Sequence, residues 1–181
     1  MPPSAAKQRA ACRELVSTEE AYLSVLDTIN TVFRTPLATW AAEGDEGNAA
    51  RSGGVTRDEL QVLFGSVEIL LNVNHALLEQ LRPNVERPAE LAQTIAAWAA
   101  GPLRYYTPHV KNFPVVCALL SRLLAERPRF EAAVRVLELQ PSAKGLKLQA
   151  LLVSTVQRLP RCARHCVLSL CAPMPVRTWV C

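Results

Sequence analysis

Charged side chains near the two ends of this sequence are placed where they could contact a partner. Glu19 and Glu20 adjoin an apolar helical pattern near the start of the chain. Arg158 and Arg161 are three positions apart, so on a helix they would share a face and could present paired donors to an acidic surface. Charged residues at such positions are more often simply solvated. The spacing therefore leaves two interpretations open, a binding surface and a solvated face.

The arginines end a segment that reads LQALLVSTVQRLPR, residues 148–161. Its apolar residues recur at intervals of three and four, which predicts a helix that buries one stripe. The residues of this stripe are Leu148, Leu151, Leu152, Val156 and Leu159. The same kind of pattern predicts a long first helix from about residue 5 or 6 to Phe33, which Pro36 should end or bend. Both pairs of charged residues therefore fall on predicted helices.

The rest of the chain is also helical in its patterns. Residues 41–55 are rich in glycine and predict a surface loop, and Thr56 to Glu59 form a capping-box sequence that should open a second helix reaching Leu81. Further helices are predicted over residues 88–100, 103–126 and 128–139. No segment alternates with a period of two. The prediction is an all-α fold, an elongated helical bundle.

Composition excludes several classes of function. The chain has 181 residues, enough for one domain or one domain and a tail. The net charge of +4 comes from four arginines in residues 158–181, so the remainder is neutral and nucleic-acid binding is disfavoured. The glycines of residues 41–55 do not fit a phosphate-binding loop, and we expect no bound cofactor. No secretory signal and no apolar run of about 18 residues is apparent, which predicts a cytoplasmic protein without stable membrane insertion.

Several cysteine, histidine and tyrosine residues could be read as sites, but each has a simpler interpretation. Cys162, Cys166, Cys171 and Cys181 crowd the last part of the chain with His165, yet their spacing matches no common zinc site. His75 is expected to be a core or edge histidine. Tyr105, Tyr106 and His109 are expected to make structural hydrogen bonds. We therefore predict no metal site.

Three segments, in this order on a helical chain, resemble the Dbl homology (DH) domain of Rho-family guanine nucleotide exchange factors. They are Glu14–Leu26 with its Thr18-Glu19 pair, the leucine-rich middle at residues 59–81 followed by residues 106–120, and the block LQALLVSTVQRLPR with Val156-Gln157-Arg158 and Pro160-Arg161. The match covers roughly residues 6–161, which we assign to a DH-like domain.

The resemblance implies a protein that binds the two switch regions of a Rho-family small GTPase, in its nucleotide-free or GDP-bound state, and promotes GDP release. It implies that Glu19 binds switch I and that Arg161 contacts switch II. Gln157 and Arg158 also match, either as further contacts or as residues that hold two helices together. The implied activity makes no covalent bond and uses no cofactor.

The chain departs from the family's pattern at two places. Ser154-Thr155 stand where the family usually has a lysine and a proline. After Arg161 the family continues into a long final helix, whereas residues 162–181 form a tail with cysteines and prolines, so we expect the bundle to be incomplete at its C-terminal end. An altered reading frame or an alternative exon is one hypothesis for this tail. Two alternatives to exchange therefore stay open, a non-catalytic protein-binding module or degenerate fragment and an inert helical scaffold.

Overall fold

The computed structural model describes residues 4–43 and 53–165, and its described side chains are those of residues 4–42 and 53–158. The predicted loop at residues 41–55 lies largely outside this part, and so does the predicted tail after residue 165. Within the described residues no strand forms. The all-α fold predicted from the sequence is confirmed.

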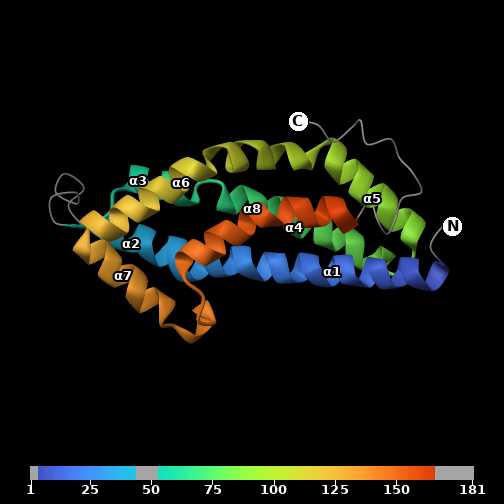
Figure 1. Cartoon of the computed structure of the whole chain (residues 1–181), viewed down its shortest axis with the longest axis horizontal. Coiled ribbons are helices and arrows are strands. Elements are labelled where there is room, and N and C mark those ends of the chain that lie inside the picture. Colours follow the sequence, from blue (N-terminus) through green and yellow to red (C-terminus); the bar gives the residue numbers. More distant parts are fainter. Residues whose placement is uncertain (1–3, 44–52, 166–181) are drawn as a thin grey trace.

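The helices follow one another with short connections (Figure 1). They are α1 (Ala5–Thr28), the π-helical turn η1 (Ile29–Arg34), α2 (Thr35–Glu43), α3 (Arg57–Phe64), α4 (Val67–Leu81), the 3-10 turn η2 (Arg82–Asn84), α5 (Pro88–Ala100), the 3-10 turn η3 (Pro102–Tyr105), α6 (Tyr106–Glu126), α7 (Pro128–Glu138), the 3-10 turn η4 (Pro141–Ala143) and α8 (Leu148–His165).

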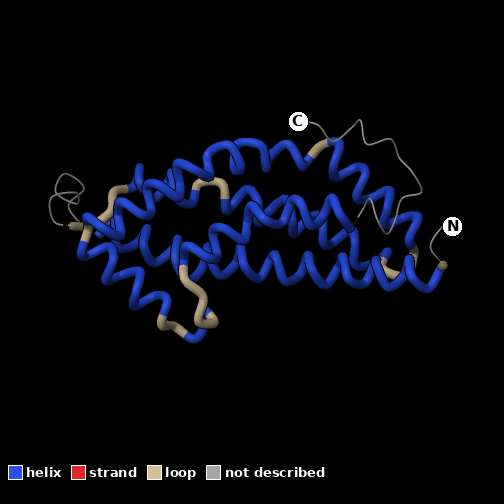
Figure 2. Tube along the Cα trace, viewed as in Figure 1, coloured by secondary structure: helices blue, strands red, loops and turns tan. Residues whose placement is uncertain are grey.

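The bundle is elongated, and α1 with its continuation runs along most of its length (Figure 1). Helices α4 and α8 both pack against α1, α6 packs against α3 and α8, and α5 packs against α4. Figure 2 shows that the loops between these helices are short, apart from the connection that leads from α7 to α8. The arrangement brings α8, near the end of the chain, beside the first helix.

The first helix does not end at Pro36, which was one of the two predicted outcomes. Helical structure continues to Glu43 through the π turn η1, in which the Thr35 N–H donates to the Asn30 carbonyl. Proline has no N–H to donate and would collide with the carbonyl four residues back in a regular α-helix. The π turn changes the hydrogen-bond register just before the proline, so the helix can continue.

The second predicted helix begins where the capping box predicts but is divided in two. The Thr56 N–H donates to Glu59 Oε2 at 3.0 Å, and the Glu59 N–H donates to Thr56 Oγ1 at 3.2 Å. At Gly65 the helix breaks, and a Cβ added there would lie 2.5 Å from the Gln61 carbonyl oxygen. The break therefore needs glycine, and α4 starts again at Val67.

One continuous hydrophobic core runs through the bundle. Its largest fully buried side chains include Phe33, Phe64, Tyr106 and Phe130. The stretch Arg57–Asn84 is long and apolar enough to cross a membrane by length and composition, a test that a buried core helix also meets. Its apolar side chains largely belong to the core. Five polar side chains are also buried within the described part, and they are Glu19, Asn74, His109, Thr155 and Arg158.

Candidate functional site

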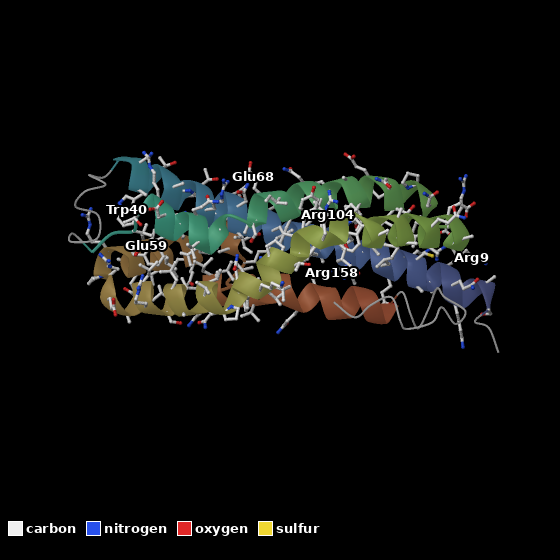
Figure 3. The ribbon with its side chains drawn as sticks, turned by 90° about the horizontal axis from the view of Figure 1, so that it is seen from above. Arg9, Trp40, Glu59, Glu68, Arg104 and Arg158 are labelled. Atoms are coloured by element: carbon white, nitrogen blue, oxygen red, sulfur yellow. The ribbon has the colours of Figure 1, made fainter. Side chains whose placement is uncertain are left out.

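Glu19 and Arg158 form a buried ion pair between α1 and α8. Arg158 Nη2 donates to Glu19 Oε2, and the side chains are only 6% and 1% exposed, respectively. Arg158 Nη1 also donates to Thr18 Oγ1 at 3.4 Å, and its guanidinium lies 5.8 Å from the centre of the Tyr22 ring. Figure 3 shows Arg158 in the middle of the molecule, away from the end where Trp40 and Glu59 lie. The pair thus joins the two segments that the sequence singled out.

The expectation that these two side chains are exposed is wrong, because both take part in the packing of α8 on α1. Glu20 is exposed, as predicted, and so is Gln157. Arg161 belongs to α8, but its side chain lies outside the described residues. The role of all four site residues in binding a GTPase stays a prediction.

A chain of hydrogen bonds between hydroxyl and amide groups crosses the core next to this pair. Asn74 Nδ2 donates to Tyr106 Oη at 2.7 Å, Tyr106 Oη donates to Tyr22 Oη at 3.3 Å, and Tyr22 Oη donates to the Thr155 carbonyl at 3.4 Å. Asn74 Nδ2 also donates to the Leu70 carbonyl at 2.6 Å. The chain connects α4, α6, α1 and α8, so it fixes the relative position of four helices.

A second branch contains His109. Thr155 Oγ1 donates to the Leu152 carbonyl at 2.7 Å, so it accepts from His109 Nε2 at 2.8 Å. In that tautomer His109 Nδ1 is an acceptor, and Ser66 Oγ donates to it at 2.8 Å. Thr155 stands where the resemblance expects a proline, so its hydroxyl supplies a contact that a proline lacks. The structural hydrogen bonds predicted for Tyr106 and His109 are confirmed.

Burial sets the protonation of these groups. Burial raises the pKa of Glu19 above its ordinary value, although the charge and hydrogen bond of Arg158 act in the opposite direction. Burial also raises the pKa of Tyr106 and lowers that of His109. The core network is therefore most stable with Tyr106 and His109 neutral.

The buried polar residues occupy core positions of the apolar stripes, and this signal was in the sequence. Glu19 lies four residues after Leu15 and three before Tyr22, in line with the stripe of α1. Thr155 lies three after Leu152, and Arg158 three after Thr155, in line with the stripe of α8. A polar residue at a stripe position indicates a buried, hydrogen-bonded group. The predicted stripe of residues 148–161 continued through Val156 and Leu159 instead of through Thr155 and Arg158.

The remaining candidates take no part in this network. Tyr105 is exposed and its hydroxyl accepts from Arg104 at 3.4 Å. His75 was expected to be a core or edge histidine, and it is exposed, so it is not part of the core. Among the described residues no cluster of histidine, cysteine and carboxylate side chains could hold a metal. The cysteines of the tail and the side chain of His165 lie outside the described part.

Solved structures with a similar fold are DH and PH domain proteins. The linker and DH/PH domains of p115-RhoGEF match with a TM-score of 0.75 at 20% identity, covering 94% of this chain and 51% of that one. The Vav1 exchange factor matches with a TM-score of 0.74 at 19% identity, covering 92% of this chain and 43% of that one. These similarities show that the chain has the DH fold, as predicted.

Sequence relatives agree with the structural ones. Protein ECT2 of Mus musculus is 26% identical over 166 residues, which cover 90% of this chain and 17% of that protein. FYVE, RhoGEF and PH domain-containing protein 6 of Homo sapiens is 28% identical over 155 residues, covering 82% of this chain and 10% of that protein. The chain thus spans a small part of the relatives that it matches. The RhoGEF domain model matches residues 11–163, so the chain belongs to the RhoGEF domain family.

Proposed function

We propose that this chain is a guanine nucleotide exchange domain that binds the switch regions of a Rho-family small GTPase and promotes GDP release. The observation that supports this most strongly is the packing of α8 against α1 within a RhoGEF domain. These helices carry Glu19 and the block that ends in Arg161, the two segments that resemble the family's GTPase contacts. Glu19 and Arg158 of this block, 139 positions apart in the sequence, are thereby brought into contact.

The residue types suit the recognition of a GTPase. The Glu19 carboxylate can accept charge-assisted hydrogen bonds from N–H or hydroxyl groups of a switch segment. The Arg161 guanidinium can pair with acidic side chains of the other switch. In this mechanism no covalent bond forms, and the chain acts by binding alone.

Exchange follows from a difference in affinity. A domain that binds the nucleotide-free GTPase more tightly than the loaded one weakens nucleotide binding by the same factor, because coupling between two ligands is reciprocal. A nucleotide held with picomolar affinity is bound by about 16 kcal/mol. A coupling of about 5 kcal/mol would speed its release by orders of magnitude if it is expressed in dissociation.

The nucleotide state of the GTPase and the location of the domain in the cell are part of the proposed function. The domain binds the GDP-bound form and holds the nucleotide-free form, it acts in the cytoplasm, and it does not insert stably into membranes. The apolar side chains of Arg57–Asn84 that join the core support the last point, because insertion would have to remove them from it.

The test is release of a fluorescent GDP analogue from a panel of Rho-family GTPases, with and without the chain. We expect faster release from at least one member, and most but not all of this acceleration should be lost in Glu19→Ala. Arg161→Ala should also reduce it. No acceleration with any member of the panel would contradict the proposed activity.

A second candidate is a module that binds a GTPase without exchange. The burial of Glu19 favours it, since a covered carboxylate has no immediate access to a switch segment. This candidate predicts that immobilised chain retains a nucleotide-free GTPase while the release rate of fluorescent GDP stays unchanged. Retention together with faster release would exclude it.

A further inference from the structure

The two oxygens of the Glu19 carboxylate have different surroundings. Oε2 accepts from Arg158 Nη2, whereas Oε1 is buried and has no hydrogen-bond partner in the described structure. A buried acceptor without a partner costs free energy that a donor would recover. One oxygen is therefore paired within the protein, and the other is a covered acceptor that a donor can reach only after the side chains around it shift.

Arg158 is held in place on several sides. Its Nη1 donates to Thr18 Oγ1 at 3.4 Å, and its guanidinium lies over the Tyr22 ring. Tyr22 is in turn fixed by its hydrogen bonds to Tyr106 and to the Thr155 carbonyl. Arg158 thus donates to two side chains of α1, those of Glu19 and Thr18. Its position suits a group that acts on Glu19 rather than on a GTPase.

We infer that Arg158 is a positioning residue, which fixes Glu19 by Oε2 so that Oε1 faces a hydrogen-bond donor of the GTPase. This inference rests on the proposed exchange function. It gives Arg158 a role different from that of Arg161, although both belong to the same block. Arg158 orients the carboxylate, and Arg161 is left to contact the partner directly.

The geometry explains why arginine suits this position. A planar guanidinium can donate to Glu19 from one nitrogen and to Thr18 from another, and it can stack on an aromatic ring. A lysine at the same position has one ammonium group and cannot make these contacts with the same geometry. Arg158→Lys therefore keeps the charge and changes the orientation of the carboxylate.

The inference also has a kinetic consequence. Because Glu19 is 1% exposed, the side chains that cover it must shift before a donor reaches Oε1. Association that needs such a change is slower than the typical rate for rigid surfaces. The positioning by Arg158 acts after this opening, by holding the carboxylate in one orientation.

The experiment measures kcat/KM for nucleotide exchange in a double-mutant cycle of Arg158→Lys and Glu19→Ala. We expect Arg158→Lys to lower kcat/KM about tenfold or more in the otherwise wild-type chain. In the Glu19→Ala background it should cause no further loss, because its effect passes through the carboxylate. Arg82→Lys is the matched control, since Arg82 makes an ion pair with the exposed neighbour Glu20, and it should leave kcat/KM unchanged.

Other results would overturn the inference. An equal loss from Arg158→Lys in both backgrounds would mean that Arg158 contacts the GTPase or serves only stability. An increase in kcat/KM would mean that Arg158 masks Glu19. A wild-type chain active on a GTPase and sensitive to Glu19→Ala, but not to Arg158→Lys, would overturn the positioning role alone. Absence of all exchange would overturn the proposed function and this inference with it.

Thr18→Val tests the positioning role of Arg158 if the Arg158→Lys variant does not fold, as shown by the absence of a cooperative melting transition. Thr18→Val keeps the shape of the side chain and removes the hydrogen bond to Arg158 Nη1. We expect a loss of a few-fold in kcat/KM that is absent in the Glu19→Ala background. An unchanged value in the wild-type background would contradict the positioning role.

Discussion

Two consecutive glutamates on α1 face different neighbours, and one is buried while the other is exposed. Glu20 pairs with Arg82 at 2.9 Å in an exposed contact, with 46% and 58% of the side chains accessible. Glu19 pairs with Arg158 in a buried contact, with 1% and 6% accessible. The residue types are the same, so the difference comes from the helices that pack on each side.

The exposed side of α1 and of its continuation η1 carries ion pairs with α4 and with the residues that follow it. Besides Glu20–Arg82, these are Arg13–Glu86 at 2.7 Å and Arg34–Glu68 at 2.8 Å. Such exposed pairs contribute little to stability, because water screens the charges and long side chains lose freedom. Substitutions of these exposed residues should therefore have little effect on stability.

The buried side of α1 combines its ion pair with the hydrogen-bond network of Tyr22, Tyr106, Asn74, Thr155 and His109. Buried charges are costly unless they are paired and hydrogen-bonded. Substitutions on this side should therefore lower the free energy of unfolding. The comparison teaches that polar content alone does not identify a site. Burial with one unused acceptor, as at Glu19, distinguishes the candidate site from the exposed ion pairs.

The largest expected effect comes from removing one member of the buried pair. Arg158→Met should lower the free energy of unfolding by about 3–5 kcal/mol, because it leaves a buried carboxylate without its cation. This is a large part of the 5–15 kcal/mol that is typical of a domain. Urea denaturation followed by circular dichroism measures it.

The double variant Glu19→Gln with Arg158→Met is the control for this prediction. It removes both charges, and we expect it to recover most of the lost stability. A loss below about 1 kcal/mol in Arg158→Met would contradict the burial of the pair, since that value is typical of exposed pairs.

A smaller effect is expected when the hydroxyl at the centre of the network is removed. Tyr106→Phe should cost about 1–3 kcal/mol, because Asn74 loses an acceptor and Tyr22 loses its donor inside the core. Tyr105→Phe removes a neighbouring hydroxyl that is exposed, and its effect should stay within about 0.5 kcal/mol. Equal effects in the two variants, measured by urea denaturation, would contradict the network.

Much of the fold could be predicted from the sequence because its signals are local. The spacing of apolar residues gives the helices, and the Thr56–Glu59 capping box gives the start of α3. The continuation through Pro36 was not predictable, because it depends on a π turn that changes the register before the proline. The break at Gly65 depends on the close approach of the Gln61 carbonyl, which spacing alone does not show.

The sequence supplied candidate residues for a site but did not show their surroundings. The resemblance identified Glu19 and the block at residues 156–161, but the burial of Glu19 and Arg158 depends on how α8 packs on α1. Thr155 and His109 lie in different helices, and their contact at 2.8 Å is a long-range one. A polar residue at a stripe position was the only local signal of this network.

Lowering the pH should destabilise the fold, because it favours protonation of the buried His109. Burial lowers its pKa below the ordinary value of 6.5, so the unfolded chain binds a proton more readily than the folded one. Stability from this residue is therefore complete above pH 6.5 and decreases as the pH falls toward the folded pKa. We expect the free energy of unfolding to decrease from pH 7 to pH 5, by less than the loss in Tyr106→Phe.

His109→Gln is the control for the effect of acid. It removes the titrating group while keeping a polar side chain that can reach Ser66 or Thr155. The decrease between pH 7 and pH 5 should become smaller in this variant. The same decrease in both chains, measured by urea denaturation at each pH, would show that other groups cause it.

The smallest effect is expected on the exposed side. Glu20→Gln and Arg82→Met should each cost no more than about 1 kcal/mol, and a double-mutant cycle should give a coupling of about 0.2–1 kcal/mol. Raising the salt concentration to 1 M shortens the screening length to about 3 Å, so this coupling should decrease further. The coupling between Glu19 and Arg158 should change much less, because water and ions do not reach a buried pair. A similar response to salt for both pairs would remove the distinction between the two sides of α1, and with it the reason to treat Glu19 as the special carboxylate.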